Sequence, residues 1–123
     1  MHWLQERLER LQALAPARDR FLGAVRQIAT EVADHEGVTA CFVCHEGLVV
    51  AAAGRGDDFD ALSAMTQHAI SAAVESASTL ELGPVHQMVI VGSQRKLSLF
   101  VTQPVAVGIL SPSTTTLSEV LRR

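Results

Sequence analysis

The stretch from Asp57 to Leu82 constrains the fold most, because it has the pattern of one long helix with more apolar surface than one neighbour can cover. Asp57 is a good N-cap, and Gly83 followed by Pro84 predicts the end of the helix. On a helical wheel the apolar residues span an arc of roughly 200°, about twice what a one-sided surface helix needs. These residues are Phe59, Leu62, Met65, Ala69, Ile70, Ala72, Ala73, Val74, Ala77 and Leu80.

One apolar face of this helix can cover a sheet, so the additional apolar surface predicts a second neighbour. We interpret the surplus as a subunit interface, since the small residues between Ser71 and Ala77 allow another helix to come close. The alternative is a central helix wrapped by its own chain, and the wheel alone does not separate the two. The remaining polar stripe carries Asp60, Gln67, His68, Ser71, Glu75 and Ser78.

Size and composition narrow the class of protein. A chain of 123 residues predicts one domain, and a 48% hydrophobic composition without tyrosine predicts an aliphatic core with enough apolar surface to favour a dimer. The formal charge of −3 and the lack of any basic run argue against nucleic acid or an anionic membrane as partner. Two cysteines, no membrane span and no export signal predict a cytoplasmic location.

Hydrophobic periodicity predicts nine elements in the order α-α-β-β-α-β-β-β-α. Glu46-Gly47 is a two-residue hairpin signal, and the flanking strands lack polar alternation, which predicts burial on both faces. Pro16 either breaks the first helical pattern or begins the second. The predicted helices are 2–14, 17–36, 57–82 and 114–123, and the predicted strands are 38–45, 48–53, 85–91, 97–102 and 105–110.

This order predicts an α+β fold, a five-stranded antiparallel sheet with helices on its faces. We assign residues 16–123 to a single domain, and residues 1–15 to an additional amphipathic helix that is too short to be stable unless it docks. The strand 85–91 is long and apolar. At a sheet edge it needs a cover or a partner strand.

The spacing Cys41-x-x-Cys44 suggests a redox or zinc site but falls inside a predicted strand. Residues three apart in a strand point to opposite faces, so the two thiols cannot meet, and we interpret both as buried structural cysteines. His45-Glu46 lies at the hairpin tip, where a solvated turn is the simpler interpretation than a base or ligand pair.

Other short motifs give no better case for chemistry. Arg55-Gly56-Asp57 matches an adhesion tripeptide, and Gly54-x-Gly56 precedes a helix as phosphate loops do. Two carboxylates at the mouth of that loop repel phosphate, and no G-K-[ST] follows. Because no triad spacing or isolated carboxylate pair is present, we predict no catalytic residue, no cofactor and no metal, and therefore not an enzyme.

Residues 37–123 resemble the Roadblock family, which comprises the dynein light-chain roadblock type and bacterial MglB-like small-GTPase regulators. The resemblance is carried by the strand-turn-strand segment 40–54, the acidic-capped, alanine-rich segment 57–73, the strand 86–91 after Gly83-Pro84, and the segment 99–111. It implies a profilin-like Roadblock sandwich. It also implies a non-enzymatic homodimer whose paired long helices form a platform for a Ras-like small GTPase, acting as a scaffold or as a GTPase-activating protein.

Carried onto this chain, the resemblance assigns two sets of residues. The implied platform consists of Gln67, His68, Ser71 and Glu75, and the implied dimer interface consists of Leu62, Met65, Ala69, Ala72, Ala73, His86, Met88 and Ile90. The alternative function is a small-ligand sensor or a general protein-interaction domain without a GTPase partner. A sensor needs a pocket between sheet and helix.

Overall fold

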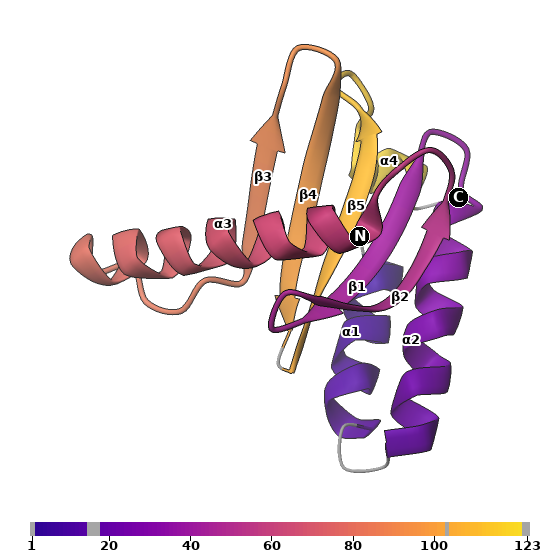
Figure 1. The fold of residues 1–123 in the computed structure, drawn as a ribbon, viewed down its shortest axis with the longest axis horizontal. Helices are drawn as coiled ribbons and strands as arrows, with labels where there is room; N and C mark the ends of the chain where they lie inside the picture. Colours follow the sequence, from indigo (N-terminus) through magenta and orange to yellow (C-terminus); the bar gives the residue numbers. More distant parts are fainter. Residues whose placement is uncertain (1, 15–17, 103, 122–123) are drawn as a thin grey trace.

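The computed structural model describes residues 2–14, 18–102 and 104–121, and the sheet they form has helices on both faces (Figure 1). The sheet is five-stranded and antiparallel, in the order β2-β1-β5-β4-β3, so β2 and β3 are its edges. The predicted fold class and order of elements are confirmed. The elements are α1 (His2–Leu14), α2 (Arg18–Ala33), β1 (Ala40–His45), β2 (Leu48–Gly54), α3 (Phe59–Thr79), β3 (Gln87–Val91), β4 (Arg95–Thr102), β5 (Val105–Pro112) and α4 (Leu117–Val120).

The two faces of the sheet carry very different amounts of core. Because successive strand residues point to opposite faces, Cys41 and Val43 of β1 join the core under α1, α2 and α4, while Phe42 and Cys44 face α3. The α1–α2 side holds most of the buried side chains, among them Leu4, Leu11, Val25, Val32, Val107 and Ile109. The buried core on the α3 side consists, within the described residues, of Phe42, Cys44, Leu99 and Ala106.

Burial on both faces is confirmed for β1 and wrong for β2. The first five residues of β1 are buried, whereas in β2 only Ala51 is buried and the other six residues are exposed or partly buried. The difference arises because β2 is an edge strand, with one long side open.

The hairpin between β1 and β2 turns as predicted. Glu46 and Gly47 both have positive φ angles, 50° and 83°, as a two-residue type I′ turn requires. His45 Nδ1 forms a hydrogen bond of 2.6 Å with the carbonyl oxygen of Pro104, which holds the hairpin tip against the β4–β5 connection. The connection between the predicted strands 97–102 and 105–110 lies partly outside the described residues, as does Pro16.

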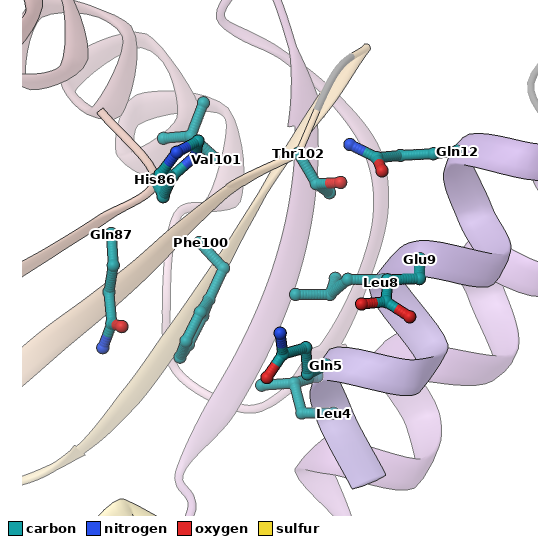
Figure 2. A pocket seen from close by; sticks show the side chains of 10 residues that line it. All are labelled: Leu4, Gln5, Leu8, Glu9, Gln12, His86, Gln87, Phe100, Val101 and Thr102. Atoms are coloured by element: carbon teal, nitrogen blue, oxygen red, sulfur yellow. The ribbon is translucent and has the colours of Figure 1, made fainter. Parts of the chain in front are cut away.

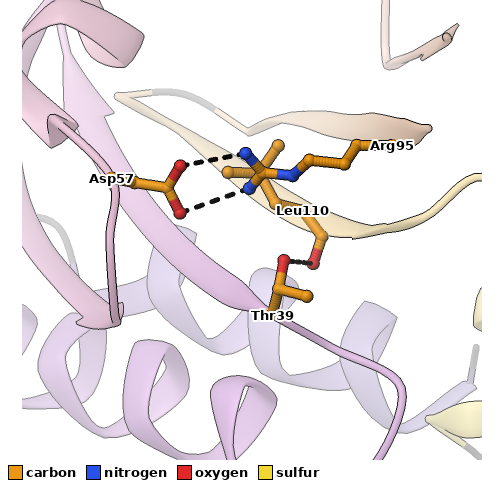
Figure 3. Close-up of polar contacts among 4 residues, drawn as sticks. All are labelled: Thr39, Asp57, Arg95 and Leu110. Atoms are coloured by element: carbon orange, nitrogen blue, oxygen red, sulfur yellow. Dashed lines mark hydrogen bonds and ion pairs between the residues drawn. The ribbon is translucent and has the colours of Figure 1, made fainter.

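The N-cap of α3 is Asp58, and the prediction of Asp57 is wrong by one residue. An Asp58 side-chain oxygen accepts a hydrogen bond of 3.1 Å from the backbone N–H of Ala61. The Asp57 carboxylate instead accepts two hydrogen bonds from the Arg95 guanidinium, at 3.1 and 3.2 Å (Figure 3). This bidentate pair ties the entry of α3 to the start of β4. In the same view the Thr39 hydroxyl donates to the carbonyl oxygen of Leu110 at 3.0 Å.

The C-terminus of α3 also differs from the prediction, since the helix ends at Thr79 and not at Leu82. Glu81 takes the left-handed conformation, with a φ of 57°, before the predicted Gly83 is reached. The backbone N–H of Leu82 donates to the carbonyl oxygen of Ala77 at 2.8 Å, and that of Glu81 donates to Ser78 at 3.1 Å. This is a Schellman motif, closed by a residue type that sequence rules do not favour there.

Several other helices and strands begin or end two or three residues away from their predicted positions. The second helix stops at Ala33, and Gly37, with a φ of 94°, closes the turn that follows it. The third strand begins at Gln87 and the fourth at Arg95, each two residues from its predicted start. The terminal helix begins at Leu117, three residues later than predicted, and residues 122–123 of its predicted range lie outside the described residues.

Candidate interaction surfaces

Helix α3 crosses the sheet and projects beyond its β3 edge (Figure 1). Its buried residues are Ser63, Thr66 and Ala77. The N-terminal half rests on the small core of this face through Phe59, Leu62 and Ile70. The chain therefore does not wrap its own central helix, and a large part of the predicted surplus surface lies open.

Exposed aliphatic side chains lie near the C-terminal end of α3 and on both faces of the neighbouring edge strand β3. Each is between 48% and 72% exposed, well above what an apolar side chain has in a core. We call this set the α3–β3 apolar surface: Val74, Leu80, Leu82, Val89, Ile90 and Val91. An apolar surface of this kind marks an interaction site.

The edge strand β3 adds unpaired backbone groups to this surface. Only β4 pairs with it, so one row of its N–H and C=O groups has no strand partner in the described chain. It contains no proline and no charged residue, the devices that usually protect an edge. As expected for an edge, this strand needs a cover.

The predicted dimer residues divide into two groups. Leu62 and Met88 are half-buried against the core of the α3 face. Ala69 and Ala73 are also half-buried, whereas Met65, Ala72, His86 and Ile90 are exposed. Their role in an interface stays a prediction. Sequence reasoning did not select Leu82, Val89 and Val91, although the apolar edge strand was an available signal for the two valines.

The predicted platform residues Gln67, His68, Ser71 and Glu75 are all exposed on α3. The first three line a hollow of about 310 Å³, together with Glu46, Gly47 and Ala64. A Cβ on Gly47 would lie 3.4 Å from the Gln67 Cβ, so the β1–β2 turn forms a close wall of this hollow. Within it, Gln67 Nε2 donates to Ser71 Oγ at 3.5 Å. Glu75 lies one turn further along α3, outside the lining.

Helix α1 docks on the opposite face of the sheet. It packs against α2 and β4, with Leu4 and Leu11 fully buried, whereas α3 packs against β1 and β2. Arg7 lies over the Trp3 ring, 5.3 Å from its centroid, and its guanidinium is 3.8 Å from the Glu31 carboxylate of α2. The polar stripe of α3 is therefore not covered by α1.

The two cysteines lie on opposite faces of β1, as predicted, and both are buried and unbonded. Burial raises the pKa of the Cys41 thiol to about 12. Burial also raises the pKa of Cys44, opposed in part by the Ser63 side chain. A protonated thiol is a poor nucleophile and a poor metal ligand. No three His, Cys, Asp or Glu side chains come together as a metal site within the described part of the chain.

None of the helices in the described residues combines the length and apolarity that crossing a bilayer requires. The surfaces available for function are therefore those of the sheet edges, of α3 and of the cavities beside the helices.

Comparison with protein families matches residues 24–106 to the Roadblock/LC7 domain. The matched region begins inside α2 and includes the whole of β1, β2, α3, β3 and β4. Helix α1 lies outside it. A search of curated proteins gave no match.

Solved structures show the same fold at low sequence identity. MglB from Myxococcus xanthus has a TM-score of 0.73 and 14% identity, with 82% of this chain and 78% of that chain covered. The Roadblock/LC7 domain from Streptomyces avermitilis has a TM-score of 0.69 and 15% identity, covering 77% and 83%. The gliding protein MglB from Thermus thermophilus has a TM-score of 0.68 and 16% identity, covering 78% and 76%. Identities this low establish the fold alone.

Proposed function

This chain belongs to the Roadblock/LC7 family, and on that premise we propose that it is a homodimeric, non-enzymatic scaffold that docks a Ras-like small GTPase. Family membership supports a regulatory or scaffolding role. The homodimer, the GTPase partner and a cytoplasmic location are our proposals. The observation that carries them is the open α3, which leaves an apolar surface on one side and a polar hollow on the other.

The proposed homodimer joins two copies through the α3–β3 apolar surface. A two-fold axis lets the β3 edge of one copy pair with the β3 edge of the other, which satisfies the free backbone row without any other chain. The same operation brings the projecting halves of the two α3 helices together, around Ala72 and Ala73. One solved structure of MglB has a tetrameric arrangement, so assembly through this fold has a precedent.

The proposed GTPase site is the polar stripe of α3 with its hollow. Its residues carry hydroxyl, amide and imidazole groups next to the Glu46 carboxylate at the turn. These groups recognise the shape and hydrogen-bonding pattern of a partner and supply no covalent chemistry. Binding one switch conformation of a GTPase better than the other shifts its population by the difference in affinity.

The proposed docking is tested by titrating the full-length chain, in a calorimeter, into purified Ras-like small GTPases of the source organism. Each GTPase is loaded with GDP or with a non-hydrolysable GTP analogue. We expect one GTPase to bind in a nucleotide-dependent manner, and Ser71→Arg to weaken that binding at least about tenfold, because a bulky charge fills the centre of the hollow.

Thr30→Arg is the matched control, since it places the same side chain on an exposed position of α2 on the other face of the sheet. It should leave the affinity unchanged. Absence of binding to any of the GTPases, or equal weakening by both variants, contradicts the proposed site.

A small-ligand sensor is the second candidate function. One observation favours it: a cavity between α1 and the sheet, of the kind that this alternative requires.

A further inference from the structure

A cavity lies between α1 and the β3–β4 edge of the sheet, on the face opposite the proposed platform (Figure 2). Its volume is about 500 Å³, within the range of small-molecule sites. Helix α1 forms one wall, and this helix lies outside the residues matched to the family. The cavity is therefore a feature of this chain in addition to the family domain.

The cavity has apolar walls of aromatic and aliphatic character. Leu4 and Leu8 reach inward from α1, and the Phe100 ring faces them from β4 (Figure 2). Leu4 and Phe100 are nearly buried and belong to the core of this face, so these walls are fixed by the fold. A slot between an aromatic ring and aliphatic side chains suits a flat apolar group.

Polar groups surround the slot. Gln5, Glu9 and Gln12 come from α1, and Gln87 and Thr102 come from the strands, with Gln12 extending toward Thr102 (Figure 2). Every one of these side chains offers an oxygen that can accept a hydrogen bond. A ligand rich in N–H donors is complementary to such a rim.

The rim carries one carboxylate and one imidazole. Among the described residues, Glu9 is the only Asp or Glu in the lining, and His86 is its only basic side chain. The ion pairs described in the structure lie elsewhere, at Arg7–Glu31, His45–Glu46 and Arg95–Asp57. The Glu9 carboxylate is thus available to a ligand and favours a cation over an anion.

From this arrangement we propose that the cavity between α1 and the β3–β4 edge is a binding site for a small planar organic cation, such as an aromatic amine or amidine. The flat apolar part lies against Leu8 and Phe100, and the cationic N–H groups donate to Glu9 and to the amide oxygens. The proposal is independent of GTPase docking, because the two sites lie on opposite faces of the sheet.

The probe is benzamidine, followed by backbone amide NMR of the full-length chain, with neutral benzamide and anionic benzoate as isosteric comparisons. We expect saturable shifts at the amides of Leu8, Gln87 and Thr102. Benzamidine should bind about five- to tenfold more tightly than benzamide, and benzoate should not bind, since a partly exposed charge contributes modestly. Raising the ionic strength should reduce the difference in affinity between benzamidine and benzamide.

Two variants locate the interaction. Glu9→Gln should reduce benzamidine binding to the level of benzamide, whereas Glu6→Gln removes the same charge from the same helix outside the cavity lining and should preserve the selectivity. Gln5→Trp fills the slot from an exposed position and should abolish binding of both. The proposal is overturned if benzamidine causes no saturable shifts, if benzamide binds equally well, or if binding survives Gln5→Trp.

Discussion

At the scale of single residues, the contact between Phe42 and Gly108 shows how a small residue positions a large one. The two face each other across the β1–β5 pair, and a Cβ on Gly108 would lie 2.3 Å from the Phe42 ring. Phe42 is the largest fully buried side chain and fills the thin core beneath α3. Its ring can lie flat on β5 only because residue 108 has no side chain.

We therefore expect Gly108→Ala to lower the free energy of unfolding by about 1–3 kcal/mol, because the ring must move out of a packed core. Gly23→Ala is the control, since Gly23 lies in α2 with nothing within 4 Å of its added Cβ. Alanine there should raise stability by about 0.5–1 kcal/mol. Urea denaturation measures both, and equal effects of the two substitutions would contradict the packing argument.

The buried Cys41 thiol makes stability depend on alkaline pH. Its pKa is raised from 9.0 to about 12 by burial, so above pH 9 the unfolded chain releases this proton and the folded chain keeps it. The stabilisation is complete below pH 9 and is lost as the pH rises from 9 toward 12, by up to about 1.4 kcal/mol per pH unit.

The difference in the free energy of unfolding between the wild type and Cys41→Ala should then decrease by about 1–2 kcal/mol between pH 9 and pH 10.5. Chemical denaturation at the two pH values measures this difference. A difference that stays constant would show that Cys41 titrates in the folded protein as it does in the unfolded chain.

At the scale of elements, features set by neighbouring residues could be predicted from the sequence, whereas features set by contacts between distant residues could not. The apolar runs of β1 and β5 and the Glu46-Gly47 turn are local signals, and the order of elements followed from them. The pairing of Asp57 with Arg95 joins positions far apart in sequence, so no local rule could move the N-cap to Asp58. Likewise, β2 is exposed because it lies at the sheet edge, and its alanine-rich sequence does not indicate that position.

The same reasoning explains which parts of the candidate sites could be predicted. The polar stripe of α3 was visible on a helical wheel, because Gln67, His68 and Ser71 follow helical spacing. The wall that the β1–β2 turn adds to this stripe depends on the tertiary approach of Gly47 to α3. The cavity beside α1 was missed, since its lining comes from a helix and two strands that are distant in sequence.

The docking of α1 makes a prediction at this scale. Leu11 is 1% exposed in the core of the α1–α2 face, so Leu11→Ala should cost about 2–4 kcal/mol and increase hydrogen exchange in α1 selectively. Arg10→Ala, at the neighbouring exposed position, should change stability by no more than about 0.5 kcal/mol. Similar costs for the two variants would mean that α1 is not held by its buried leucines.

At the scale of the whole molecule, the uneven covering of the sheet connects the fold to the proposed assembly. Among the described residues, α1, α2 and α4 cover one face, and the N-terminal half of α3 packs on the core of the other. The projecting half of α3 and the edge of β3 leave aliphatic side chains and backbone groups in solvent together. In the proposed homodimer a second copy of the chain would cover both at once, and no segment among the described residues does so.

Light scattering of the wild type and of Ile90→Arg tests this claim most directly. Ile90 is 48% exposed in β3, so arginine there is compatible with a folded single chain but not with a buried edge-to-edge contact. We predict twice the chain mass for the wild type, the single chain mass for Ile90→Arg, and an intact dimer for Leu48→Arg, which changes an exposed leucine at the opposite edge. A monomeric wild type, or an Ile90→Arg variant that remains dimeric, would contradict the account.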